Sequence, residues 1–216
     1  MQISIIIATY NSGKYLGRAI RSCLDQSMAQ QQYEIIVVDD GSTDYTDHVL
    51  HTFGDQIRVI KSERNMGLPY ACNTGIRSTR SQFFVRVDAD DYIHHDLLKV
   101  EHLYLTMNNN IDAVSCDYLL VDDDENIIRR ASGEEEPIAC GIMFRKDRVV
   151  DVGLYDENFL LSEEEDLRIR FLKKYNIFNI PLLLYRYRMH GNNSTKNEAK
   201  KGYYKKLLKG KHNLDV

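Results

Sequence analysis

The first half of the chain alternates short apolar runs with segments of helical periodicity. Four apolar runs have the length and composition of strands that are buried on both faces: residues 3–8, 34–38, 57–60 and 83–87. Between them, apolar residues recur with a helical period in three segments: residues 12–24, 49–53 and 68–76. Ser12 stands where it can cap the first of these helices. Strands that alternate with helices predict an open, mainly parallel sheet wound with right-handed crossovers and flanked by helices.

The second half is less regular, and its pattern predicts a mixture of elements. The pattern favours helices at 96–107 and 164–174, strands at 112–122 and 141–144, a hairpin tip at 122–130 and an acidic loop at 133–137. No Pro/Ser-rich linker, repeat or low-complexity tract divides the chain. We therefore expect residues 1–195 to form one α/β domain whose irregular later elements build a second wall beside the sheet.

Polar residues follow three of the predicted strands: Thr9-Tyr10-Asn11, Asp39-Asp40 and Asp88-Ala89-Asp90-Asp91. In a wound parallel sheet, ligands bind beyond the carboxyl ends of the strands. The three groups are therefore expected to meet in one crevice.

The composition excludes several classes of protein. The 216 residues include 28 Lys and Arg against 32 Asp and Glu, which gives no electrostatic footprint for general nucleic-acid binding. No apolar run approaches the roughly 18 residues of a membrane span, and the N-terminus lacks the layout of a signal peptide, so a cytoplasmic location is expected. The four cysteines are widely spaced without a CxxC pair, which argues against a zinc site.

The charge is unevenly distributed, because residues 196–216 carry seven lysines against two acidic residues. Within this basic tail, an apolar stripe is flanked by lysines and consists of Tyr203, Tyr204, Leu207 and Leu208. Such a stripe is suited to an anionic surface at the inner face of the membrane. The alternative is a C-terminal helix that lies in solvent.

The acidic run at residues 88–91 is a candidate metal site. Carboxylates at alternate positions of a strand end can point into one site, and oxygen ligands with open positions suit Mg²⁺ or Mn²⁺ bridging a diphosphate. Alternatively, Asp91 caps a turn and the other carboxylates are solvated.

The pair Asp39-Asp40 is a candidate nucleoside contact. A carboxylate at this strand end can accept hydrogen bonds from a base or a ribose. Alternatively, one aspartate closes an Asx turn before the next helix.

Five motifs occur in an order and at a spacing that are informative together: residues 4–11, 36–44, 64–67, 73–75 and 87–91. Taken together they closely resemble the family 2 glycosyltransferases with a GT-A fold, and the resemblance extends from residue 3 to about residue 195. It implies that residues 1–95 are the nucleotide-binding half and that residues 96–195 are the half that binds the acceptor and carries the base.

The resemblance also implies roles for single residues. Asp40 is implied to contact the base, beside Thr9 and Tyr10. The full set of implied donor contacts is Thr9, Tyr10, Asn11, Asp39, Asp40, Arg64, Asn65, Gly67, Asn73, Arg86, Asp88, Ala89 and Arg188. The implied ligands of Mn²⁺ or Mg²⁺ are Asp90, Asp88 and His190, the last from a Tyr-Arg-x-His ending. The family usually has an Arg where this chain has Cys72, so one expected cationic contact near the donor diphosphate is missing. We expect Arg86 or Arg64 to take its place.

The segment at residues 162–170 resembles the family's Glu-Asp-x-Asp-Leu-x-x-Arg motif. In this register Glu164 occupies the position of the catalytic base, and Glu163, Glu165 and Asp166 are its neighbouring alternatives. A single carboxylate is needed to take the proton of the acceptor hydroxyl. Alternatively, acidic residues in the first turn of a helix only complement its dipole.

The resemblance thus implies an inverting, metal-dependent glycosyltransferase. Its expected donor is a nucleoside-diphosphate-sugar, taken as UDP-linked, and its expected acceptor is a hydroxyl of a glycan or lipid-linked molecule in cell-surface polysaccharide or glycoconjugate synthesis. Two alternatives remain. A sugar-nucleotidyltransferase shares the wound sheet but normally has a Gly-rich basic loop where this chain has residues 9–13. A non-catalytic nucleotide-sugar-binding module is suggested by Cys72 and the Glu-Glu base region.

Overall fold

The computed structural model describes residues 1–191 and 198–213. Within this part the strands are β1 (Ile3–Thr9), β2 (Tyr33–Asp39), β3 (Arg58–Lys61), β4 (Phe83–Arg86), β5 (Tyr92–Ile93), β6 (Ala113–Val121), β7 (Ile127–Ala131), β8 (Met143–Arg145) and β9 (Ile177–Arg188). The helices are α1 (Gly13–Leu24), α2 (Thr46–His51), α3 (Leu68–Ser78), α4 (Leu97–Met107), α5 (Lys146–Asp151), α6 (Glu163–Leu172) and α7 (Glu198–His212). Two short 3₁₀ turns, η1 (Gln30–Gln32) and η2 (Gly54–Gln56), precede β2 and β3.

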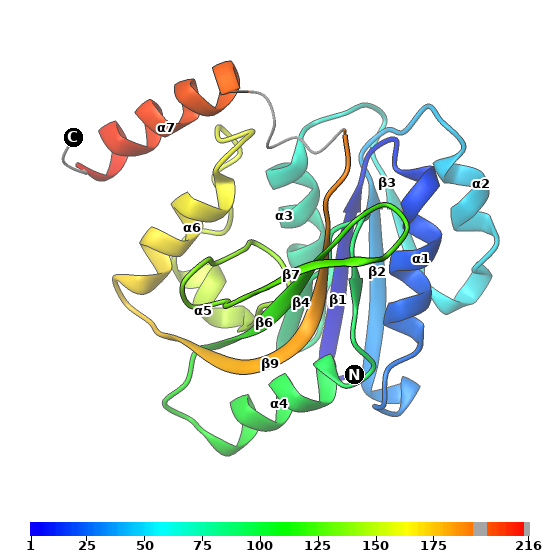
Figure 1. Cartoon of the computed structure of the whole chain (residues 1–216), viewed down its shortest axis with the longest axis horizontal. Helices are drawn as coiled ribbons and strands as arrows, with labels where there is room; N and C mark the ends of the chain where they lie inside the picture. The colour runs from blue at the N-terminus through cyan, green and yellow to red at the C-terminus, as the bar shows by residue number, and fades with distance from the viewer. Residues whose placement is uncertain (192–197, 214–216) are drawn as a thin grey trace.

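The described strands form one sheet in the order β3-β2-β1-β4-β8-β6-β9-β5, with β7 paired to β6 outside this path (Figure 1). The four strands of the first half, β1 to β4, run parallel to one another. β8 runs antiparallel between β4 and β6 and so joins the second half to the same sheet. The predicted α/β architecture is therefore confirmed, and the irregular half continues the sheet.

The sheet is covered on both faces because its central strands are apolar on both sides. In β1, Ile3, Ile5 and Ile7 are fully buried and pack with α1 and α4. Ile6 points to the opposite face and packs with α3, α5 and α6. This arrangement leaves the carboxyl ends of β1, β2 and β4 open at one edge of the molecule.

Local patterns predicted the first half well. Each predicted strand there begins and ends within one residue of the observed strand. Ser12 occupies the N-cap position as predicted, but its side chain makes no capping bond, and its hydroxyl donates to the carbonyl of Tyr10 at 3.1 Å. The carboxylate of Asp44 accepts the Gly13 N–H at 3.1 Å instead.

The longest strand, β9, was not predicted from the sequence. Its pairing with β6 is interrupted by shifts of register around Asp117, and Pro181 lies near its middle, so neither a strict alternation nor a continuous apolar run marks it. The strand can form because β6 offers it a long partner. Its last residues return to the carboxyl end of the sheet.

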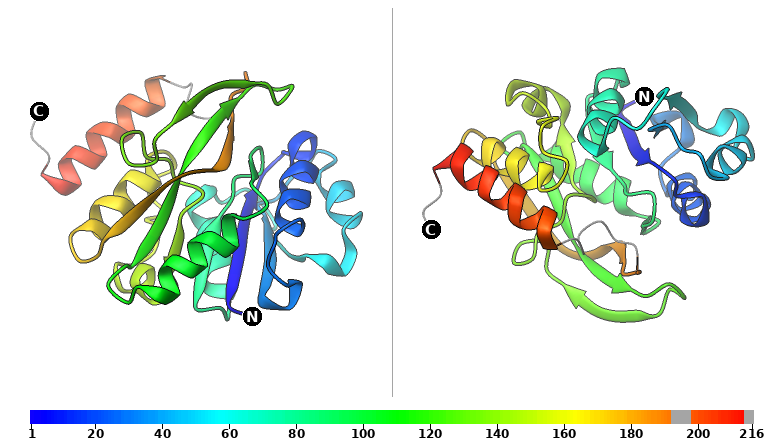
Figure 2. Two further views of the ribbon diagram at one scale, coloured as in Figure 1. Left: turned by 60° about the horizontal axis from the view of Figure 1, so that its bottom comes forward. Right: turned by 90° about the horizontal axis from the view of Figure 1, so that it is seen from above.

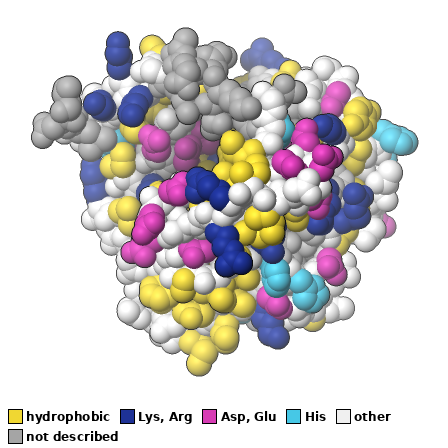
Figure 3. All heavy atoms as spheres, viewed as in Figure 1, with side chains coloured by type: hydrophobic (Ala, Val, Ile, Leu, Met, Phe, Trp, Pro, Cys, Tyr) yellow, Lys and Arg dark blue, Asp and Glu magenta, His cyan; other side chains and the backbone are white. Residues whose placement is uncertain are grey.

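The C-terminal helix α7 lies beside α6 in both views of Figure 2. The predicted domain boundary at residue 195 falls outside the described residues. No helix in the described part combines the length and the apolar character that crossing a bilayer requires. Among the described side chains on the face shown in Figure 3, acidic and basic groups are interspersed and form no single basic area.

Candidate active site

A cavity of about 680 Å³ opens at the carboxyl ends of β1 and β4. Predicted site residues from distant parts of the chain line it: Tyr10, Asn11, Arg86, Asp88, Ala89, Asp90, Glu163, Glu164 and His190. A smaller cavity of about 190 Å³ adjoins it and is lined in part by Thr9, Tyr10, Asp40, Asn65 and Gly67. The topology thus brings the predicted donor, metal and base residues to one edge of the sheet.

Asp40 is a buried anchor for the loop that follows β3. Its carboxylate accepts the backbone N–H of Met66 at 3.0 Å and that of Gly67 at 2.8 Å. The loop packs tightly, since a Cβ on Gly41 would lie 2.6 Å from the backbone of Arg64. The carboxylate therefore shapes the smaller cavity while lining it.

Asn11 and Asp39 fasten the neighbouring turns. The Asn11 side-chain oxygen accepts the N–H of Thr43 at 2.8 Å, and Asp39 accepts the N–H of Ser42 at 3.0 Å. The contact between Asp39 and Ser42 is the turn that the sequence analysis gave as the alternative to a nucleoside contact. Asp40, and not Asp39, is the carboxylate that borders a cavity.

Three other implied donor contacts lie away from the two cavities. The Asn73 amide donates to the Tyr155 carbonyl at 2.9 Å and to Glu157 at 2.8 Å. Arg188 is buried, and it donates to the Asp90 carbonyl at 2.9 Å and to Glu125 at 3.1 Å. Arg64 is exposed and lines neither cavity. Asn73 and Arg188 therefore hold loops around the site.

The carboxylates after β4 divide into two kinds. Asp88 and Asp90 face the large cavity with side chains that are 26% and 30% exposed. Asp91 is buried, and it accepts the hydroxyl of Tyr185 and the backbone N–H of Arg188, both at 2.8 Å. Asp91 is therefore more than a turn cap, because it ties β9 to the acidic run.

Asp90 and His190 form a contact at the mouth of the large cavity. Their Oδ2 and Nε2 atoms are 2.8 Å apart, and the imidazole stacks on the ring of Tyr15 with centroids 4.8 Å apart. Burial raises the pKa of Asp90, and the charge of Asp88 raises it further. Two carboxylates that repel each other beside an open cavity are suited to a divalent cation.

A second group of possible ligand atoms lies deeper. Asp88, Asp91 and Cys140 each offer one atom, and these atoms lie within 4.8 Å of one another. Burial raises the pKa of the Cys140 thiol well above its usual range. A buried protonated thiol is a poor ligand for Mg²⁺ or Mn²⁺, which prefer oxygen, so Cys140 does not suit the expected cation.

Arg86 connects the acidic run to α6. Its Nε donates to Asp88 at 2.7 Å and its Nη1 to Glu163 at 3.1 Å, and the residue is only 4% exposed. Burial raises the pKa of the Cys72 thiol to about 12, and the nearby Arg86 guanidinium opposes that rise. The guanidinium near Cys72 thus comes from β4, and it is engaged by two carboxylates.

The four acidic residues that begin α6 have different surroundings. Glu163 is buried against Arg86, and burial raises its pKa to about 7. Glu164 is partly exposed and lines the large cavity. Glu165 is exposed and lines neither cavity, and Asp166 is fully buried. Glu164 is therefore the carboxylate of this turn with both access to the cavity and a solvated side chain.

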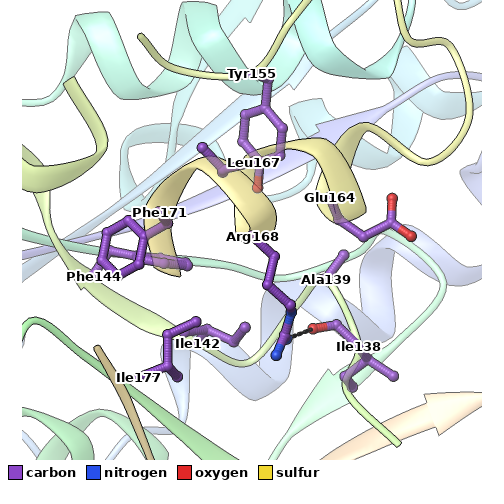
Figure 4. Close-up of a pocket in the computed structure, with 10 residues that line it drawn as sticks. All are labelled: Ile138, Ala139, Ile142, Phe144, Tyr155, Glu164, Leu167, Arg168, Phe171 and Ile177. Atoms are coloured by element: carbon purple, nitrogen blue, oxygen red, sulfur yellow. Dashed lines mark hydrogen bonds between the residues drawn. The ribbon is translucent and has the colours of Figure 1, made fainter. Parts of the chain in front are cut away.

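Glu164 also borders a small apolar cavity of about 20 Å³ behind α6 (Figure 4). The rings of Phe144, Phe171 and Tyr155 surround one side of it, and the Glu164 carboxylate points away from these rings. Arg168 crosses to the Ile138 carbonyl at 3.3 Å. Apolar side chains thus pack behind the stem of Glu164 and leave its carboxylate toward the large cavity.

Comparison with known proteins identifies relatives along most of the chain. The profile described as "Glycosyl transferase family 2" matches residues 4–168. A relative from Rickettsia typhi, an uncharacterized glycosyltransferase, is 29% identical over 236 residues, which cover 96% of this chain and 73% of the relative. Poly(ribitol-phosphate) beta-N-acetylglucosaminyltransferase TarS of Staphylococcus aureus is 34% identical over 102 residues, which cover 46% of this chain and 18% of TarS.

Solved structures share the fold over the whole chain. S. aureus TarS 1–349 in complex with UDP-GlcNAc aligns with a TM-score of 0.82 at 20% identity, covering 100% of this chain and 68% of that chain. Mannosyltransferase PcManGT from Pyrobaculum calidifontis, in complex with GDP-Man and Mn²⁺, aligns with a TM-score of 0.76 at 15% identity, covering 100% and 65%. At such identities the likeness establishes the fold.

Proposed function

The chain belongs to glycosyl transferase family 2, and we propose that it transfers one sugar from a nucleoside-diphosphate-sugar to a hydroxyl of a glycan or lipid-linked acceptor, with inversion at the anomeric carbon. The family and the GT-A fold predicted from the sequence motifs are confirmed. The proposal extends this to the donor, the metal and the base. Its main support is that Glu164 lines the same cavity as Asp88 and Asp90.

Glu164 is the base in this proposal. It takes the proton of the acceptor hydroxyl as that oxygen attacks the anomeric carbon opposite the leaving diphosphate. Glu163 is buried against Arg86, and Asp166 is bound by the side chains of Arg170, Lys211 and His212, so neither is available for this step. The apolar packing behind Glu164 holds its stem while the carboxylate stays accessible.

Asp88, Asp90 and His190 would hold Mn²⁺ or Mg²⁺. A divalent cation there supplies positive charge that stabilises a leaving nucleoside diphosphate. The raised pKa of Asp90 supports this assignment, because a cation would relieve its repulsion by Asp88. Arg86 keeps Asp88 in place from behind through its 2.7 Å contact.

The donor is proposed to be UDP-linked. TarS, which shares the fold, has been crystallised with UDP and with UDP-GlcNAc, and PcManGT with GDP-Man. The smaller cavity beside Thr9, Tyr10 and Asn65 is the proposed nucleoside pocket. Asp40 contributes by fixing the loop that closes this pocket.

The acceptor is proposed to be reached at the cytoplasmic face of a membrane in polysaccharide or glycoconjugate synthesis. The predicted apolar stripe of the tail is divided in the structure, since Leu208 is 4% exposed whereas Tyr203 is 64% and Leu207 39% exposed. The outward pair lies among lysines that include Lys205 and Lys206. A narrower surface than the sequence predicted is thus left for anionic lipid, and Lys196 of the tail is outside the described residues.

A panel of nucleotide sugars tests the proposal directly. Thermal unfolding is measured with UDP, UDP-GlcNAc, UDP-glucose and GDP-mannose, each with and without Mn²⁺. UDP-sugars with Mn²⁺ should raise the melting temperature most, since binding to the folded state stabilises it. Asp90→Asn should remove the Mn²⁺-dependent part of the shift, and Glu134→Gln, at an exposed acidic residue that lines neither cavity, should leave it intact.

Absence of any shift with every nucleotide would contradict the donor assignment. A shift that is equal for UDP with and without Mn²⁺ would contradict the metal assignment. Release of UDP from the sugar that binds best, measured with water as the acceptor, separates a transferase from a binding module. Release of pyrophosphate from UTP and a sugar phosphate would instead indicate a nucleotidyltransferase.

A further inference from the structure

The C-terminal helix α7 is docked on the region that carries the proposed base (Figure 2). Leu208 is buried, and the ring of Tyr204 lies 6.4 Å from that of Phe159, which is 2% exposed. Phe159 belongs to the loop at residues 156–162 that leads into α6. The inner face of α7 therefore packs on this loop.

A cluster of charges joins α7 to α6 at a fully buried carboxylate. Asp166 accepts hydrogen bonds from Arg170 at 2.7 Å and 2.9 Å, from Lys211 at 2.6 Å and from His212 at 2.8 Å. Although burial opposes it, the bonds from Lys211, Arg170 and His212 hold the pKa of Asp166 below its usual range. Two of the three partners of this carboxylate thus come from α7.

Lys211 also reaches the loop that precedes the base. Its ammonium lies 2.7 Å from Asp156 and 4.9 Å from the centroid of the Phe159 ring. The same ammonium therefore bridges both ends of the segment at residues 156–166. Leu160 lies between these ends. Its side chain would be 2.7 Å from a Cβ on Gly67, so it packs directly against the loop at residues 64–67 that borders the smaller cavity.

The backbone is strained at the turn between the loop at residues 156–162 and α6. Contacts from other parts of the chain are therefore important for holding this turn in place. Ser162 has a φ of 63°, in the left-handed region, and its side chain makes no capping bond to α6. Glu163 and Glu164 follow it immediately. The orientation of the Glu164 carboxylate is thus set by a turn without a cap of its own.

We propose that Lys211 and His212 are positioning residues for the proposed base, acting through Asp166 and Asp156. The proposal rests on the assignment of Glu164 as base. If both Lys211 and His212 are removed, Asp166 stays buried with Arg170 alone, and the first turn of α6 relaxes toward solvent to hydrate it. Glu164 then loses its orientation, while the donor pocket formed by residues after β1, β2 and β3 keeps its shape.

The test combines amide hydrogen exchange with steady-state kinetics on the full chain. In Lys211→Gln/His212→Gln, exchange of peptides from residues 156–166 should become about 10-fold faster or more. The kcat for UDP release from UDP-GlcNAc with Mn²⁺ should fall about 10-fold while KM for the donor stays within about twofold. Lys211→Arg and Lys211→Gln are compared as single variants. Because Lys211→Arg keeps the charge, it should restore both the exchange rate at 156–166 and kcat.

Lys174→Gln is the matched control. Lys174 pairs with Asp151 at 2.9 Å just beyond the C-terminal end of α6, so the variant also breaks a Lys–Asp pair near the same helix. It should leave exchange at 156–166 and kcat unchanged. Should the double variant unfold, Lys211→Gln alone is measured at a temperature below its melting transition.

The outcomes separate this inference from the proposed function. Unchanged exchange at 156–166 in the double variant overturns the positioning role, whatever the kinetics. Faster exchange with unchanged kcat also overturns it, because the segment would then move without affecting the reaction. If Glu164→Gln is fully active, the base assignment fails. That result comes from a different variant than the test of the positioning role, so the two failures can be told apart.

Discussion

Two walls enclose the large cavity and the smaller cavity that adjoins it, and they are stabilised in different ways. The donor wall, formed by residues 9–11, 39–44 and 64–67, is fixed by side-chain oxygens that accept backbone N–H groups, as Asp40 does from Met66 and Gly67. The base wall, formed by residues 86–91, 156–166 and α7, is fixed by buried charges that pair with each other, such as Arg86 with Glu163. Changes to the donor wall should therefore affect binding of the donor. Apart from the proposed metal ligands Asp88 and Asp90, changes to the base wall should affect stability and turnover.

The largest expected effect follows from removing the base itself. Glu164→Gln keeps the size of the side chain and removes its ability to take a proton, so kcat should fall by about 10²- to 10⁴-fold. The donor should still bind, because the donor wall is untouched. Turnover and donor affinity are measured on the same preparation, and Glu134→Gln, on an exposed loop, is the control.

Retained turnover in Glu164→Gln would place the base elsewhere. Glu163 would then be the next residue to test, since it lines the same cavity. A parallel loss of donor binding would instead mean that the two walls are not separable as proposed.

The second effect concerns stability. Arg86→Met leaves Glu163 buried without its cation, and breaking a buried pair in this way costs about 3–5 kcal/mol of unfolding free energy. Arg58→Met is the control, because Arg58 pairs with Glu34 while its own side chain is 45% exposed. The control should cost about 1 kcal/mol or less. Urea unfolding of both variants gives the comparison, and equal losses would show that the base wall has no special dependence on its buried charges.

The same contrast explains what the sequence could predict. The contacts of the donor wall lie at the ends of apolar strands, and both the strands and the turn residues leave a local pattern, so Asp39 and Asp40 were found together. The sequence could not decide which of these two aspartates contacts a ligand and which closes a turn. That difference depends on which backbone N–H groups donate to each carboxylate in the folded chain.

The base wall leaves little local trace. Arg86 and Glu163 are 77 positions apart, and Asp166 meets His212 across 46 positions. The family motif indicated the acidic turn at residues 163–166, yet only packing distinguishes exposed Glu165 from buried Asp166. The β9 strand was missed for a related reason, since its pairing with β6 is long-range and irregular.

A third prediction tests the donor wall. Asp40→Asn removes the negative charge and leaves one acceptor oxygen in place of two for the N–H groups of Met66 and Gly67, so these bonds weaken and the loop at 64–67 should loosen. KM for the UDP-sugar should rise about 10-fold with kcat within about twofold. Asp47→Asn, on the exposed face of α2, should change neither quantity. A fall in kcat without a change in KM would contradict the division between the walls.

The smallest predicted effect lies on the face of the sheet opposite to α6, where α4 packs on β6. Glu101 is fully buried, and neither of its carboxylate oxygens has a hydrogen-bond partner in the described part of the chain beyond a weak thiol donor at Cys116. Burial raises the pKa of Glu101 well above its usual range. Unlike Asp166, this carboxyl has no cationic partner among the described residues to compensate for its burial.

The sign of its pH dependence follows from proton binding. Above the ordinary pKa of about 4.5, Glu101 is ionised in the unfolded chain but still protonated in the folded protein, so the folded state binds more protons and stability falls as pH rises. Glu101→Met removes this penalty and should stabilise the protein by about 1–2 kcal/mol at pH 8, with a smaller gain at pH 4.5. Glu134→Met, at an exposed position, should show no such difference between the two pH values. Unfolding free energies of the three proteins at both pH values decide the matter, and a gain that does not grow with pH would mean that Glu101 is ionised and compensated in the folded state.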